Sequence, residues 1–179
     1  VEHVLKLPDT YVGSVERQQD KINVIVKKIV DEQKVVTIQK KTISYIPAFY
    51  KIYDEIIANA EDQDTRLRLD HKQFLQSKKK NKKPIELVSE IRIEIDKETG
   101  MISVYNDGDG IDILKMKEHN MYPPELIFGN LLTSANYDEK QDKITGGKNG
   151  YGAKLANIFS TKFIVETVDR IRKKHYIQT

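Results

Sequence analysis

The chain has 179 residues, of which 39% are hydrophobic and 32% are charged, and its formal net charge is +3. This length predicts one domain with its own core, and the composition is that of a soluble globular protein without a membrane-spanning segment. Cysteine is absent, which excludes disulfides, thiolate zinc sites and cysteine nucleophiles. The four histidines lie too far apart in the sequence to favour a histidine metal cluster.

The first half of the chain is predicted to combine short strands with one helix. A turn-rich entry at 8–14 is followed by three β-branched segments, spaced as a meander of strands, at 22–30, 34–38 and 42–46. Pro47 suits the first position of a helix, and apolar residues recur at helical spacing over 47–63. The polar, lysine-rich stretch 64–87 is predicted to be a loop or an insertion.

The second half begins with a predicted hairpin, because 91–95 and 101–105 both alternate apolar and polar residues. Loops are expected at 106–113 and 133–149, helices at 124–132 and 151–160, and strands at 162–168 and 174–179. Strands and helices mix without strict βαβ alternation. The predicted fold class is therefore α+β, a two-layer sandwich with a mixed, mostly antiparallel sheet and helices on one face.

Three polar side chains form a column along the predicted helix 47–63. Glu55, Asn59 and Asp62 stand at i, i+4 and i+7. They flank an apolar stripe that is expected to face the core and consists of Phe49, Ile52, Tyr53, Ile56, Ile57 and Ala60. A carboxylate can deprotonate a water, and an amide oxygen suits Mg²⁺. The alternative is that the column is only the solvated shoulder of an amphipathic helix.

Two glycine-rich segments are candidates for nucleotide contacts. In 106-NDGDG-110, Asn106 or Asp107 could bind the exocyclic amine of a base, while Gly108 and Gly110 would let a flat ligand approach the main chain. A plain Asn-Asp-Gly turn is the alternative.

The second glycine segment, 145-TGGKNGYGAKLANIFS-160, has glycines at 146, 147, 150 and 152 just before a predicted helix. Their spacing matches neither a dinucleotide fingerprint nor a Walker A loop. Backbone N–H groups at a helix start, with Lys148 and Lys154 nearby, suit a phosphate, although a flexible glycine loop would look similar. Taken with the acidic helix and the first glycine loop, this segment predicts an ATP site that is not of the Walker type.

These three motifs, Glu55-x-x-x-Asn59, Asn106-Asp-Gly-x-Gly and Gly147-x-x-Gly-x-Gly, resemble those of the GHKL ATPases. The segments 2–16, 52–63, 125–139 and 144–167 are similar to the ATPase domain of eukaryotic-type DNA topoisomerase II. The resemblance implies a GHKL (Bergerat) fold over residues 1–179. It also implies a fragment of a longer topoisomerase whose transducer and DNA-cleavage domains lie elsewhere.

The resemblance also implies residue roles. Glu55 would activate the water that attacks the γ-phosphate, Asn59 would ligate Mg²⁺, and Asn106 would contact the adenine. Further ATP contacts would come from Ser134, Ala135, Asn136, Gly147, Lys148, Asn149, Gly150, Tyr151, Gly152, Ala153 and Lys154. Within this set, Lys154 would contact phosphate oxygens.

Some positions depart from the family pattern. Ala135 stands where a second serine is usual, Asp109 where a basic residue is common, and Asp112 where a proline is expected. The stretch 70–87 looks like an insertion. Its lysine run at 78–84 is interpreted as a solvated loop, with DNA contact or targeting as the alternative.

The resemblance implies an ATP-driven gate in which two copies close around DNA during strand passage, in the nucleus or in a viral replication compartment. By itself this fragment is expected to bind ATP weakly or to hydrolyse it slowly, and not to cleave DNA. Two other interpretations stay open. One is another GHKL ATPase of the mismatch-repair type, and the other is a module that dimerises with nucleotide without turnover.

Overall fold

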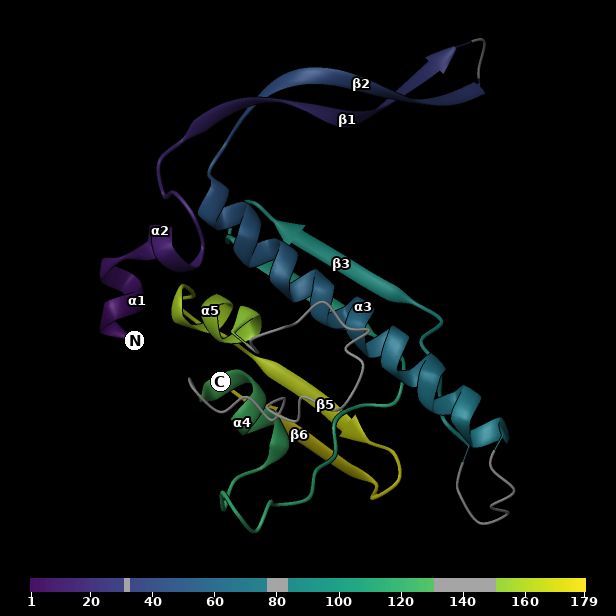
Figure 1. The fold of residues 1–179 in the computed structure, drawn as a ribbon. Coiled ribbons are helices and arrows are strands. Elements are labelled where there is room, and N and C mark those ends of the chain that lie inside the picture. The colour runs from purple at the N-terminus through teal and green to yellow at the C-terminus, as the bar shows by residue number, and fades with distance from the viewer. Residues whose placement is uncertain (31–32, 77–83, 131–150) are drawn as a thin grey trace. The chain divides into compact units, whose positions relative to one another are not determined.

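The computed structural model describes residues 1–30, 33–76, 84–130 and 151–179. The chain divides into an N-terminal unit, Glu2–Lys51, and a main unit, Ile52–Thr179, which also includes Val1. Helices and strands are mixed and every strand pair is antiparallel, which confirms the α+β class (Figure 1). The elements are α1 (Glu2–Lys6), α2 (Pro8–Tyr11), β1 (Gln18–Val30), β2 (Gln33–Tyr45), α3 (Pro47–Gln76), β3 (Ile91–Asp96), β4 (Met101–Asn106), α4 (Pro123–Gly129), α5 (Gly152–Ile158), β5 (Val165–Asp169) and β6 (Lys174–Gln178).

The N-terminal unit is dominated by a long β-hairpin. β1 and β2 pair over 13 residues each, from Gln18 opposite Tyr45 to Val30 opposite Gln33. The predicted meander of three strands is therefore wrong, because 34–38 and 42–46 belong to one continuous strand. The intervening residues 39–41 contain neither glycine nor proline, so nothing there ends the strand.

The helix α3 is much longer than predicted. It runs for 30 residues to Gln76, so that 64–76, predicted to be loop, is helical. This stretch has no glycine or proline, and ion pairs at i, i+4 join Arg68 to Asp64 and Arg66 to Asp70. Its polar composition reflects an exposed helix surface and not a loop. The first part of the supposed insertion 70–87 is thus an extension of α3.

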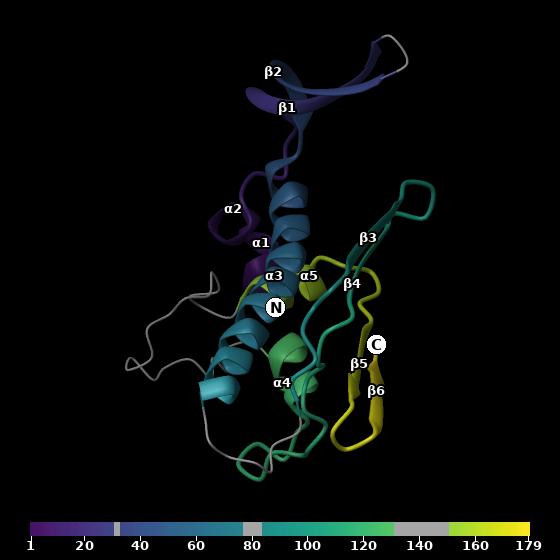
Figure 2. The ribbon, with the colours of Figure 1, turned by 90° about the vertical axis from the view of Figure 1, so that its right-hand side faces the viewer.

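The main unit contains two further hairpins, which appear as separate ribbons in Figure 2. β3 and β4 pair from Ile91 opposite Asn106 to Asp96 opposite Met101, which confirms the predicted hairpin. Gly100 has a φ of +69° in the connection, a conformation that glycine adopts without steric strain. β5 pairs with β6. Main-chain hydrogen bonds therefore link the described strands as three pairs, and not as one continuous sheet.

The core of the main unit lies among α3, α4, α5 and β5. Its buried apolar side chains include Ala60, Leu67, Val88, Ile113, Leu126, Leu155 and Val165. α4 and α5 are joined by a hydrogen bond from the Asn157 side chain to the Phe128 carbonyl, at 3.0 Å. The predicted stripe on α3 is half-buried from Ile52 to Ile57 and buried at Ala60.

Phe49 was predicted to belong to that core stripe, but it is 59% exposed. Phe49 lies in the first turn of α3 and belongs to the N-terminal unit, whereas Ala60 belongs to the core of the main unit. Within the described residues, no helix combines the length and apolar character needed to cross a bilayer.

Candidate functional site

The side chain of Glu55 lies against the first residue of α5. A Cβ added to Gly152 would overlap the Oε2 atom of Glu55 and would come within 2.6 Å of its Cδ. The φ of Gly152 is not positive, so glycine is needed here for space and not for backbone conformation. The closeness of these two residues brings the acidic column of α3 to the end of the second glycine segment.

Asn59 lies one turn further along α3. Its Nδ2 donates a hydrogen bond to the main-chain carbonyl of Glu55, at 2.6 Å. This bond fixes the amide and leaves its Oδ1 as an acceptor, which is the ligand type that Mg²⁺ prefers. No group of three or more His, Cys, Asp or Glu side chains in the described part of the chain is arranged to hold a metal. A Mg²⁺ ion here would therefore need phosphate oxygens and waters as its other ligands, which fits its usual binding to nucleotides.

The first glycine segment is braced by Asp107. Its carboxylate accepts hydrogen bonds from the Ser89 hydroxyl at 2.5 Å and from the main-chain N–H groups of Ser89 and Glu90, at 2.8 and 2.9 Å. These bonds, above all the one from Ser89, lower the pKa of Asp107 to about 2. Because Asp107 is occupied in this way, Asn106, the last residue of β4, is the better candidate for contact with a base.

Both glycines of this segment are packed tightly against protein. A Cβ on Gly108 would come within 2.7 Å of both Leu67 and Val88, and one on Gly110 would lie 2.5 Å from the Thr167 hydroxyl. Neither residue has a positive φ. Both glycines therefore let protein atoms pack closely around this loop, and the approach of a flat ligand to the main chain stays a prediction.

The helix α3 contacts both glycine segments. Gln63 donates a hydrogen bond to the carbonyl of Asp109 at 2.5 Å, and Leu67 lies next to Gly108. Two turns earlier, Glu55 meets Gly152. One helix thus connects three motifs that are well separated in the sequence.

The two acidic departures from the family pattern both pair with arginines. Asp109 is held by Arg170 through two hydrogen bonds, at 2.9 and 3.1 Å, and Asp112 pairs with Arg172 at 3.0 Å. Burial alone would raise the pKa of Asp109, but hydrogen bonds from Arg170 and the Glu86 N–H outweigh it, and the pKa is lowered. Asp109 and Asp112 therefore fasten the loop to the β5–β6 connection, a role that sequence analysis did not identify.

Asp169, at the end of β5, is the most buried carboxylate of this network. The residue is 4% exposed, and it accepts hydrogen bonds from the main-chain N–H groups of Ile113 and Arg172, at 3.0 and 2.8 Å. The Arg172 guanidinium adds a third bond at 2.8 Å. Burial would raise the pKa of Asp169, yet these donors together lower it to about 2. The carboxylate ties the loop after β4 to β5.

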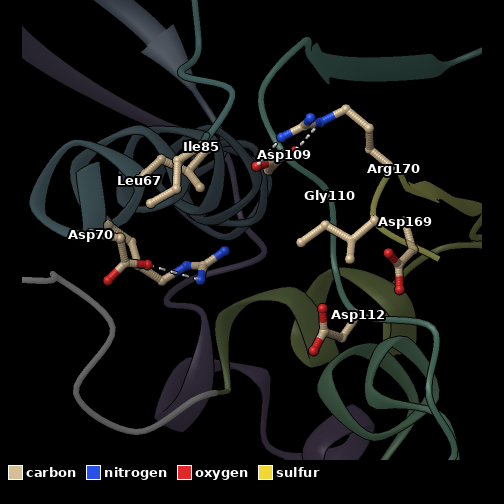
Figure 3. Close-up of a pocket in the computed structure, with 10 residues that line it drawn as sticks. Leu67, Asp70, Ile85, Asp109, Gly110, Asp112, Asp169 and Arg170 are labelled. Atoms are coloured by element: carbon tan, nitrogen blue, oxygen red, sulfur yellow. Dashed lines mark hydrogen bonds and ion pairs between the residues drawn. The ribbon is translucent and has the colours of Figure 1, made fainter. Parts of the chain in front are cut away.

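A small pocket of about 140 Å³ lies beside this network (Figure 3). Figure 3 shows Asp109 paired with Arg170 on one side of the pocket and Asp70 on the other, where its ion-pair partner is Arg66. Its lining residues are Arg66, Leu67, Asp70, Ile85, Asp109, Gly110, Asp112, Asp169, Arg170 and Ile171. Gly110 of the first glycine segment lines it, but none of the residues to which the family resemblance gives an ATP contact does. Its charged groups are already paired, so the pocket belongs to the support of the loop.

The remaining described site residues are Tyr151, Gly152, Ala153 and Lys154, at the start of α5. The residue Lys154 is only 3% exposed, and burial lowers the pKa of its ammonium group. The other predicted ATP contacts lie outside the described residues, namely Ser134, Ala135, Asn136, Gly147, Lys148, Asn149 and Gly150. The same is true of lysines 78–80, 82 and 83 of the lysine run.

The relatives found by comparison with known proteins are DNA topoisomerases 2. No family model matches the chain. It is 45% identical to human DNA topoisomerase 2-alpha, over 100% of this chain and 10% of that protein. It is 43% identical to DNA topoisomerase 2 of Acanthamoeba polyphaga mimivirus, over 99% of this chain and 12% of that protein. The chain thus spans about a tenth of the length of these relatives.

Solved structures agree with the sequence relatives. The ATPase region of Saccharomyces cerevisiae topoisomerase II superimposes with a TM-score of 0.77 and 41% identity, covering 99% of this chain and 40% of that one. The ATPase and transducer domains of DNA topoisomerase II from Balamuthia mandrillaris give a TM-score of 0.71 and 40% identity, covering 99% of this chain and 43% of theirs. These matches confirm the GHKL type of fold expected from the motifs.

Proposed function

Since this chain belongs to the DNA topoisomerase II family and corresponds to its ATPase region, we propose that it binds and hydrolyses ATP as the gate module of a type II topoisomerase. ATP binding would draw two copies together, and the complete protein would use this closure to pass one DNA duplex through another. The substrates are ATP and, through the complete protein, DNA, and the location follows the DNA, in the nucleus or in a viral replication compartment.

One observation carries the proposal: α3 brings its acid and amide to the second glycine segment while it also contacts the first. Glu55 meets Gly152, and Gln63 binds the loop that follows Asn106. An acid, a candidate metal ligand and a candidate base contact are thereby connected through one rigid element. Phosphoryl transfer needs mainly such positioning together with charge stabilisation.

The proposed chemistry assigns one step to each group. The Glu55 carboxylate takes a proton from a water molecule while the oxygen of that water attacks the γ-phosphorus of ATP. The bond between this phosphorus and the oxygen that leaves with ADP breaks. Asn59 would hold Mg²⁺, which when bound neutralises phosphate charge. Asn106 would bind the adenine amine, and Lys154 at the start of α5 would contact phosphate oxygens.

Replacement of Asn59 by Ala tests nucleotide binding. We expect the affinity for a non-hydrolysable ATP analogue with Mg²⁺ to fall about tenfold or more, the order of one contact to a charged group. The fold should change little, because the hydrogen bond that this amide donates stays within its own helix. Calorimetric titration measures the affinity. Without Mg²⁺ the parent and the variant should bind alike, and undiminished affinity with Mg²⁺ would refute the metal role.

Replacement of Gly152 by Ala tests the contact that carries the proposal. The new Cβ would collide with the Glu55 carboxylate, so this side chain must move. We expect ATP turnover to fall about 10- to 100-fold, because small displacements of a reacting group have effects of this size. Gly129→Ala is the matched control, since a Cβ there meets nothing within 4 Å. Equal turnover in the two variants would contradict the assignment of this site.

A further inference from the structure

The β1–β2 hairpin exposes several large apolar side chains. Ile25 and Ile38 face each other in the register and are 69% and 73% exposed. Ile29 is 76% exposed. A two-stranded hairpin is only marginally stable in water unless another surface covers it. This hairpin therefore presents a long exposed surface on which a partner can be bound.

The two faces of the hairpin differ sharply in charge. In an antiparallel pair, opposed residues share a face and neighbours along a strand alternate between faces. One face, called the lysine face here, carries no carboxylate and holds four lysines, Lys21, Lys27, Lys34 and Lys40, around Ile25 and Ile38. The opposite face carries Asp20, Lys28 and Lys41. A hydrogen bond from the Tyr45 hydroxyl to Asp20, at 2.9 Å, lies on this opposite face and agrees with the assignment.

The lysines of the lysine face form two diagonal pairs. Lys27 opposes Val36 while Lys34 opposes Ile29, and Lys21 and Lys40 are placed in the same way nearer the base of the hairpin. Lys27 lies six positions after Lys21 on the same strand, a spacing of about 20 Å. All four lysine residues are exposed, and none of the ion pairs between described residues includes them.

We propose that the lysine face is a binding surface for the backbone of duplex DNA. A row of phosphates complements four lysines on a face without carboxylates, and a two-stranded ribbon fits the major groove of a duplex. Asn23 and Thr42 lie on the same face and can donate further hydrogen bonds to phosphates. A second copy of the same face would be repelled by its own four positive charges.

The choice of DNA as the anionic partner rests on the proposed function. The charge pattern of the hairpin is an observation that does not depend on that function. Because β1 and β2 belong to the N-terminal unit and Glu55 belongs to the main unit, binding of DNA and binding of ATP can be measured as separate properties. Binding to the lysine face needs no ATP. Contacts to phosphates carry no sequence information, so binding should not depend on the DNA sequence.

The test uses the 179-residue chain and a fluorescent 20-base-pair duplex, with binding followed by anisotropy at several salt concentrations and without nucleotide. We expect the double variant K27Q/K34Q to bind about tenfold or more weakly. The slope of log affinity against log salt should fall by about 2, because two phosphate contacts are lost. The control is K28Q/K41Q, which removes the same charge from the opposite face. We expect its affinity to stay within about twofold of the parent, because its lysines contact no phosphate.

Circular dichroism must show that both variants keep the strand content of the parent. Equal losses in the two variants would overturn the proposal, and so would unchanged binding by K27Q/K34Q. So would a parent that binds vesicles of anionic lipid but not the duplex. Titration of the same variants with an ATP analogue separates the two proposals. If the duplex binds through the lysine face while the parent fails to bind the analogue, the proposed ATPase function fails and the DNA surface stands.

Discussion

Replacement of Glu55 by Gln should abolish most ATP turnover while nucleotide binding persists. Glutamine has nearly the same shape but cannot accept a proton from water, and loss of a general base lowers turnover by about 10²- to 10⁴-fold. The contact with Gly152 is kept, because the side chain fills the same space. Phosphate release measures the turnover, and the affinity for a non-hydrolysable analogue should stay within about threefold of the parent.

The neighbouring residue provides a matched control for this experiment. Asp54 precedes Glu55 in α3 but is exposed on the outer side of the helix, so Asp54→Asn removes the same charge one residue away. We expect it to keep the turnover of the parent. If Glu55→Gln hydrolyses ATP at the rate of Asp54→Asn, the base assignment is wrong. Retained binding without turnover in the parent itself would instead favour a nucleotide-dependent dimerisation module.

Local patterns in the sequence predicted local structure well. The alternation of 91–95 and 101–105 predicted the β3–β4 hairpin, although none of the residues of these strands is buried, and Gly100 supplies the turn between them. The failure at 64–76 came from judging the stretch by its polarity and not by its i, i+4 charge spacing. The stretch 64–76 looked like a loop because most of its residues are polar, yet i, i+4 ion pairs support it as the end of α3.

The candidate site was predictable only in part. The column of Glu55 and Asn59 follows from helical spacing, but its contact with Gly152 joins positions that no local pattern relates. The pairing of Asp109 with Arg170 spans 61 residues. Asp109 and Asp112 attracted notice as departures from the family pattern, and their arginine partners give the physical reason for them. Gly108 and Gly110 also allow close packing, which the sequence did not indicate.

The second large effect should come from Asp169→Asn. The amide loses the charge that faces the Arg172 guanidinium and cannot accept all three hydrogen bonds, so N–H groups are left unsatisfied in a buried position. We expect the free energy of unfolding to fall by about 2–4 kcal/mol. Glu166→Gln on the same strand is the control. Its pair with His175 is exposed, so we expect a change below about 0.5 kcal/mol in urea unfolding.

The pH dependence of this difference gives a separate check. The pKa of Asp169 is about 2 in the folded chain, below its ordinary value of 3.8. A lowered pKa stabilises the folded state above the unfolded value, and this stabilisation is lost as the pH falls through the folded one. The gap in unfolding free energy between the parent and Asp169→Asn should therefore be full at pH 5 and shrink by roughly 2 kcal/mol towards pH 2. Asp107 loses its own contribution in the same window in both proteins, so it cancels in the comparison. A gap that stays constant from pH 5 to pH 2 would mean that packing, and not the carboxylate charge, holds the loop after β4 against β5.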